Sequence, residues 1–241
     1  MGTLPLWARK LLANGVHLFT ATGAVWGFLT LLAIWEGNIK IAVMYIIVAM
    51  FVDGFDGTLA RWFDVKTYAT WIDGGLMDNI IDYLTYVIVA SLLLLKVPNL
   101  LPQGLEMFAA VSILLTSAFQ FSQVEAKNDG SDSYFFKGFP SVWNFIVLYL
   151  MLLGLNPWIN FAVLMICNVL VFVPVRFLYP TRNNRFRRFT LAFSYLYGIL
   201  GVWGLMHYPD VPQWVAPASG VYVVYYVVMS LFPKLGAPKT A

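Results

Sequence analysis

The chain has 241 residues, of which 60% are hydrophobic, 17% aromatic and only 11% charged. A soluble domain carries about twice that share of charged residues, so the composition excludes an ordinary soluble globular protein. The formal net charge of +3 gives no reason to expect a nucleic-acid partner. Apolar runs recur along the whole sequence, which predicts a polytopic protein surrounded by membrane lipids.

The apolar runs predict an all-α protein, a transmembrane helical bundle of about eight spans. In chain order the predicted helices cover residues 14–35, 39–62, 71–95, 104–126, 140–155, 157–178, 187–207 and 214–233. The fifth and sixth are short and are separated only by Gly154 to Pro157, so a re-entrant hairpin is an alternative to two spans there. We expect the whole chain, residues 1–241, to form a single integral-membrane domain.

Basic residues test the topology. With this set of spans and a cytoplasmic N-terminus, 13 of the 15 lysines and arginines fall on the cytoplasmic side. The other side keeps only Lys40 and Lys96. Cytoplasmic loops are enriched in basic residues, so this asymmetry predicts that both termini are cytoplasmic.

Acidic residues are concentrated in one part of the chain, because six of the twelve lie between Asp53 and Asp82. Asp53 and Asp56 are one helical turn apart near the end of the second predicted span. Asp78 and Asp82 share one face of the third. Antiparallel packing of these spans can bring the four carboxylates to one depth. Ionised carboxylates so close in a low-dielectric site need protonation or a divalent metal, so this cluster is the first candidate for a functional site.

Small residues flank the carboxylates. Gly57 and Ala60 leave a bare helix face beside Asp56, which suits either a flat ligand or a closely packed helix. Gly74 continues the face that carries Asp78 and Asp82. At the cytoplasmic end, Arg61 can extend its charge to the membrane surface or hold a phosphate.

These residues resemble the signature of the CDP-alcohol phosphotransferases, which here takes the form Asp53-x-x-Asp56-Gly57-x-x-Ala60-Arg61 and Gly74-x-x-x-Asp78-x-x-x-Asp82. The twelve residues between Arg61 and Gly74 are more than most members have, and in this the chain is similar to bacterial phosphatidylcholine synthases. A second stretch, "FFKGFPS" at residues 135–141, resembles a motif of phosphatidylserine and phosphatidylcholine synthases.

The resemblance implies an enzyme of the bacterial cytoplasmic (inner) membrane, often a homodimer, with its active site on the cytoplasmic side. Such an enzyme uses one or two Mn²⁺ or Mg²⁺ ions to transfer a phosphatidyl group from CDP-diacylglycerol to an alcohol, releasing CMP. It implies metal ligands at Asp53, Asp56, Asp78 and Asp82, of which Asp78 and Asp82 are catalytic and Asp82 is the general base. It implies a nucleotide site lined by Asp53, Gly57, Ala60, Arg61 and Gly74.

Choline is the acceptor that the resemblance favours. A quaternary ammonium is bound by aromatic faces and carboxylates, and the candidate choline residues are Tyr83, Tyr86, Glu125, Phe136, Trp143 and Asn144. Lys127 and Lys137 keep serine open as the alternative acceptor. An intramembrane prenyltransferase, which also pairs aspartate motifs with Mg²⁺, and an ion-coupled transporter are the remaining alternatives; transporters usually show internal repeats, which are not evident here.

Overall fold

The computed structural model describes residues 4–123, 135–174, 176–178 and 187–231. The chain divides into two compact units, Met1–Leu92 and Leu93–Ala241. The described residues are predominantly helical, as predicted, with one pair of three-residue strands. Three helices, Leu6–Trp35, Gly74–Lys96 and Arg188–Met206, are long and apolar enough to cross a membrane. The count of eight spans and the orientation of the termini stay predictions.

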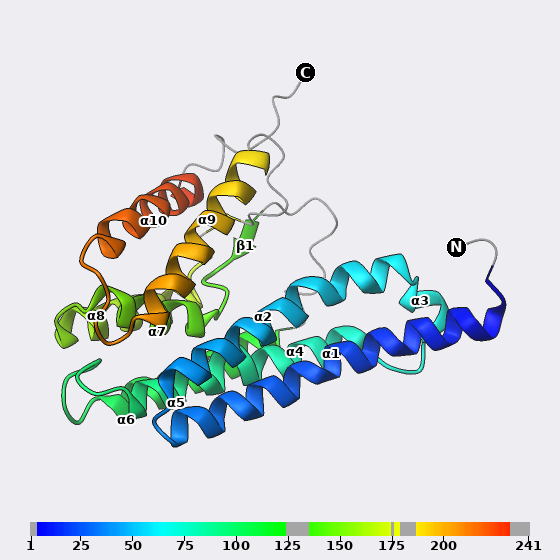
Figure 1. Cartoon of the computed structure of the whole chain (residues 1–241), viewed down its shortest axis with the longest axis horizontal. Helices are drawn as coiled ribbons and strands as arrows, with labels where there is room; N and C mark the ends of the chain where they lie inside the picture. The colour runs from blue at the N-terminus through cyan, green and yellow to red at the C-terminus, as the bar shows by residue number, and fades with distance from the viewer. Residues whose placement is uncertain (1–3, 124–134, 175, 179–186, 232–241) are drawn as a thin grey trace. The chain divides into compact units, whose positions relative to one another are not determined.

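Unit 1 consists of helices that follow one another without long loops. They are α1 (Leu6–Trp35), α2 (Ile39–Trp62), α3 (Val65–Tyr68), α4 (Gly74–Asp82), the π-helical turn η1 (Tyr83–Ile88) and α5 (Val89–Lys96), which ends in unit 2. Figure 1 shows α1, α2 and α4 side by side, and α1 contacts both of the others. The predicted second and third spans are therefore neighbours of the first.

The turn from α1 to α2 has a well-defined helix stop. Gly37 has φ +77, and its N–H donates to the carbonyl of Ile34 at 3.0 Å. The N–H of Asn38 donates to the carbonyl of Ala33 at 2.8 Å. This pair of bonds is the Schellman motif, in which a glycine in the left-handed region satisfies the last helical carbonyls. It explains why the chain reverses at "EGN" and sends α2 back along α1.

Two glycines allow α1 to approach the third predicted span closely. A Cβ added at Gly23 would lie 2.7 Å from Cγ2 of Ile81, and one at Gly27 would lie 2.9 Å from Cδ2 of Leu84. Gly23 and Gly27 are four residues apart, so they share one face of α1. Small residues at this spacing are a common means of helix packing in membranes. The contact fixes α4 and η1, which carry the candidate site, against α1.

The lengthened corner between α2 and α4 forms the short helix α3. Val65 and Ala69 are buried against Ala13 and Val16 of α1. Helix α1 begins at Leu6, eight residues before the predicted start of the span, residue 14. Of the two partners, Ala13 lies just before the predicted span and Val16 lies inside it.

Two side-chain hydrogen bonds tie the same corner to α1. The guanidinium of Arg9 donates to the phenol of Tyr68 at 2.9 Å. The indole N–H of Trp71 donates to the amide oxygen of Asn14 at 2.6 Å. The extra residues of the corner thus belong to the packed structure of unit 1.

Unit 2 contains the remaining helices and the two strands. They are α6 (Glu106–Phe121), β1 (Phe135–Lys137), α7 (Trp143–Leu153), α8 (Pro157–Leu170), β2 (Arg176–Leu178), α9 (Arg187–Met206) and α10 (Val215–Leu231). The strands pair antiparallel, with Phe136 opposite Phe177. Helix α6 contacts α8, while α7, α9 and α10 contact one another.

All eight predicted segments contain a helix, but several bounds were wrong. The third begins at Gly74 rather than residue 71, because Asp73 accepts a hydrogen bond from the Leu76 N–H and caps the helix. The sixth ends at Leu170, and the chain goes on to β2 where helix had been predicted through residue 178. Helices α7 and α8 have 11 and 14 residues, shorter than the roughly 20 of a full span, which suits a re-entrant hairpin as well as two short spans.

The "FFKGFPS" stretch contains a backbone position that only glycine can occupy. Gly138 has φ +78, and a Cβ added there would lie 2.5 Å from the carbonyl oxygen of Val171. Next to it, the Phe139 N–H donates to the carbonyl of Leu170 at 2.9 Å. A backbone hydrogen bond therefore joins this part of the stretch to the end of α8.

Hydrogen bonds between uncharged side chains join the end of this stretch, and Trp143 just after it, to α6. The hydroxyl of Ser141 donates to the side-chain oxygen of Gln120, and the indole of Trp143 donates to the hydroxyl of Ser117 at 2.7 Å. The resemblance noted at "FFKGFPS" therefore coincides with a structural junction between α6, α7 and α8.

Candidate active site

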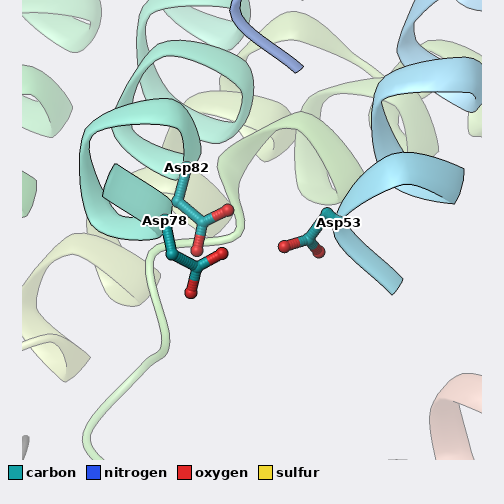
Figure 2. A group of neighbouring side chains, drawn as sticks. All are labelled: Asp53, Asp78 and Asp82. Carbon is teal, nitrogen blue, oxygen red and sulfur yellow. The ribbon is translucent and has the colours of Figure 1, made fainter. Parts of the chain in front are cut away.

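Three of the four predicted metal ligands converge in unit 1. Asp53 lies on α2, and Asp78 and Asp82 lie on successive turns of α4. One carboxylate oxygen from each lies within 4.8 Å of one from each of the others, and all three side chains are half-buried. Figure 2 shows Asp78 and Asp82 projecting from one helix toward Asp53 on another. The four-residue spacing on α4 puts its two carboxylates on one face, as predicted.

This cluster fits a divalent cation. Three carboxylates so close together repel one another in a half-buried site, and a cation between them would offset that charge. Carboxylate oxygens are the ligands that Mg²⁺ and Mn²⁺ prefer in proteins.

Asp56 differs from the other three. It is 9% exposed, and it does not belong to the group of carboxylates within 4.8 Å. Its side chain interacts with that of Thr20, a buried residue of α1. Thr20 was not among the predicted site residues, although it lies between His17 and Gly23 on the buried face of α1. Asp56 as a metal ligand stays a prediction.

Tyr86 contacts the cluster through its hydroxyl. The phenol donates to Oδ2 of Asp53 at 2.7 Å and belongs to the π-helical turn η1, which begins directly after Asp82. Nothing in the sequence indicates such a turn, and it was not predicted. Single π-turns inside α-helices are frequent at functional sites.

The predicted nucleotide residues have different surroundings. A Cβ added at Gly74 would lie 3.1 Å from Cε1 of His17, whose Nε2 lies 3.3 Å from the carbonyl oxygen of Ala69. The space beside Gly74 is therefore filled by the His17 ring. Ala60 packs against the buried cluster of the α3 corner.

Gly57 and Arg61 are more open than Ala60 and Gly74. The nearest atom to a Cβ added at Gly57 is Nη1 of Arg61, at 3.6 Å. Arg61 is exposed, and its guanidinium donates to the Thr58 hydroxyl at 3.0 Å. The Arg61 guanidinium thus lies beside Gly57 on α2, and Arg61 is the residue that was predicted to hold a phosphate.

The predicted choline residues are not brought together in one unit. Tyr83 is half-buried in η1, whereas Trp143 and Asn144 are buried in unit 2, Trp143 with 0% of its surface exposed. Glu125 and the side chain of Phe136 lie outside the described part of the chain. For all of these residues choline binding stays a prediction.

Comparison with known proteins identifies the class. Residues 10–175 match the model of the CDP-alcohol phosphatidyltransferase family. Since this is more than half of the chain, the protein belongs to that family. The resemblance carried by the aspartate motif is confirmed, and the protein is an integral membrane transferase.

Individual relatives indicate which members of the family the chain is similar to. The chain is 37% identical to a phosphatidylcholine synthase of Legionella pneumophila, over 90% of this chain and 86% of the relative. It is 34% identical to one of Mesorhizobium japonicum, over 94% and 90%, and 36% identical to one of Pseudomonas aeruginosa, over 78% of each chain. The similarity to these bacterial phosphatidylcholine synthases thus covers most of this chain and most of each relative.

Proposed function

We propose that the protein condenses CDP-diacylglycerol with choline to give phosphatidylcholine and CMP. The observation that carries the proposal is the convergence of Asp53, Asp78 and Asp82, from two helices, within 4.8 Å of one another. The similarity to phosphatidylcholine synthases over most of the chain supports choline as the acceptor. The carboxylate cluster supports a centre for phosphatidyl transfer, and the names of the relatives support the choice of alcohol.

The three carboxylates would hold Mn²⁺ or Mg²⁺, one ion or two, and Asp56 would complete the set. A divalent cation bound there would supply positive charge to offset the negative charge of the pyrophosphate. Asp53 also faces the nucleotide, with Gly57 and Ala60 beside it. The exposed guanidinium of Arg61 would pair with a phosphate at the end of α2.

Asp82 would take the proton of the acceptor. The hydroxyl oxygen of choline attacks the phosphorus that bears diacylglycerol, and the bond from that phosphorus to the CMP oxygen breaks. The hydroxyl proton goes to the Asp82 carboxylate, and CMP leaves. Asp78, one turn earlier on the same face, positions the donor at the same centre.

The membrane arrangement is also a proposal. We place about eight helices in the bacterial inner membrane, with both termini and the aspartate cluster on the cytoplasmic side. The uneven distribution of lysine and arginine supports this orientation. The protein would act as a homodimer of single-domain chains, as the family resemblance implies.

An acceptor panel tests the function. Purified protein is given CDP-diacylglycerol, Mn²⁺ and either choline, serine, glycerol phosphate or inositol, and both lipid product and CMP are measured. We expect phosphatidylcholine and CMP in equal amounts with choline, and background with the others. Phosphatidylserine in place of phosphatidylcholine would overturn the acceptor assignment and leave the transferase chemistry intact.

A further inference from the structure

We propose that Tyr86 is a positioning residue for the metal centre, which holds the Asp53 carboxylate in the orientation that a divalent cation requires. The inference rests on the proposed function, because it assigns Tyr86 a part in that same site. It replaces the prediction that Tyr86 contacts choline. The phenol donates to Oδ2 of Asp53 at 2.7 Å, across 33 positions of sequence.

Asp53 needs such a partner more than Asp78 and Asp82 do. Asp78 and Asp82 come from the same helix, so the backbone of α4 sets their separation. Asp53 is the only one of the three supplied by α2. Its two oxygens can point in several directions by rotation about the side-chain bonds, and a hydrogen bond to one oxygen leaves the other oriented for a cation.

The π-turn explains how Tyr86 reaches Asp53. Four residues of α-helix rotate by about 400°, so each step of four drifts about 40° around the helix. Residue 86 of a regular helix would therefore lie about 80° away from Asp78. A π-helical turn is wider, so four residues complete less rotation than in an α-helix and the drift is reduced or reversed. Since η1 begins at Tyr83, it returns Tyr86 toward the face that carries Asp78 and Asp82.

Burial separates this role from choline binding. Tyr86 is 9% exposed, so little of its ring is open to a quaternary ammonium. A cation–π site needs an accessible ring face, whereas a positioning role needs only the hydroxyl. Tyr86→Phe keeps the ring and removes the hydroxyl, so one substitution distinguishes the two roles.

The test measures Mn²⁺ binding directly, by electron paramagnetic resonance of the purified protein without substrates. We expect Tyr86→Phe to weaken Mn²⁺ binding by about tenfold or more, the usual cost of losing a partner of a metal ligand. In choline transfer, the Mn²⁺ concentration for half-maximal rate should rise in parallel. Saturating Mn²⁺ should restore kcat, and KM for choline should not change.

Tyr45→Phe is the matched control. Tyr45 lies on α2 and its ring packs 5.9 Å from that of Trp26, so the control removes a phenol hydroxyl of unit 1 away from the cluster. It should bind Mn²⁺ as the wild type does. If Tyr86→Phe gives no monodisperse protein, Tyr86→Leu removes the same hydroxyl and carries the same test.

The outcomes separate this inference from the proposed function. Unchanged Mn²⁺ affinity in Tyr86→Phe overturns the positioning role, even if the wild type makes phosphatidylcholine. A raised KM for choline with unchanged Mn²⁺ affinity also overturns it, in favour of acceptor binding. Weaker Mn²⁺ binding in a protein that makes no phosphatidylcholine supports the role of Tyr86 and removes choline as the acceptor.

Discussion

The two units differ in the polar side chains that they enclose. In the described residues of unit 2 the buried polar side chains are neutral, and they form hydrogen bonds within the unit, although the side-chain oxygen of Asn160 has no partner. Examples are the Trp143–Ser117 hydrogen bond of 2.7 Å and the Ser117–Ser141 hydrogen bond of 3.1 Å. Unit 1 instead brings together three carboxylates.

The two arrangements differ in whether their hydrogen bonds and charges are satisfied within the protein. A neutral donor and acceptor satisfy each other, so their hydrogen bond is complete within the protein. An ionised carboxylate accepts hydrogen bonds but cannot donate one, and one tyrosine hydroxyl cannot balance the charge of three carboxylates. Under the proposed function a cation and a phosphate-bearing substrate would complete unit 1, whereas the junction between α6 and α7 is held by hydrogen bonds within the protein. Substitutions at the carboxylate cluster of unit 1 should accordingly affect catalysis, and substitutions at the polar junction of unit 2 should affect stability.

The largest effect is expected for Asp82→Asn. Its amide oxygen can still face a cation, but it cannot take the proton of the choline hydroxyl. We expect kcat to fall by about 10²- to 10⁴-fold, with CDP-diacylglycerol binding retained, as measured by CMP release and by binding of labelled donor. Asp73→Asn is the control, because an asparagine also caps α4, and it should keep wild-type turnover. Full activity in Asp82→Asn would remove the proton-transfer role.

Gly138→Ala should reduce the stability of unit 2. The new Cβ would lie 2.5 Å from the carbonyl oxygen of Val171, in a residue with φ +78. The left-handed backbone alone costs about 1 kcal/mol for alanine, and the clash adds about 1–3 kcal/mol. Gly154→Ala is the control, since its φ is +58 but nothing lies within 4 Å of its Cβ. Thermal unfolding in detergent should show Gly138→Ala clearly below Gly154→Ala, and equal midpoints would contradict the junction.

Thr20→Val should have a smaller effect, confined to unit 1. It removes the hydroxyl that interacts with Asp56 and keeps the shape of the side chain. Because a charged group loses a polar neighbour, we expect Mn²⁺ affinity or kcat to fall by about tenfold. Thr22→Val is the control, because the Thr22 hydroxyl donates to the carbonyl of Phe19 on its own helix at 2.6 Å. Equal losses in the two variants would mean that Asp56 does not depend on Thr20.

The smallest effect is expected for Tyr68→Phe. It removes the 2.9 Å hydrogen bond between Arg9 and the lengthened corner, at a partly buried position. Such a bond contributes about 0.5–1.5 kcal/mol, so the melting midpoint should fall by only a few degrees. Phosphatidylcholine synthesis should stay near the wild-type rate. A large loss of activity would show that the corner acts in the reaction as well as in packing.

The sequence predicted what depends on spacing along a single helix. The four-residue interval of Asp78 and Asp82 determines a shared face in any α-helix, and α2 and α4 were correctly expected to meet. The separation of Asp56 from the other three could not be predicted, because it depends on how side chains pack across helices. The π-turn at Tyr83 and the packing of α3 on α1 have no periodic signal. They depend on tertiary contacts that composition and hydropathy do not describe.

The central claim is that carboxylates of α2 and α4 hold the cation used for transfer to choline. The most direct test titrates Mn²⁺ into chelator-treated wild type and Asp78→Asn, and measures phosphatidylcholine formed from CDP-diacylglycerol and choline. Wild type should rise from background to full rate with Mn²⁺, and Asp78→Asn should stay near background at every concentration. Full activity of the chelated wild type, or a wild-type response of Asp78→Asn, would contradict the account.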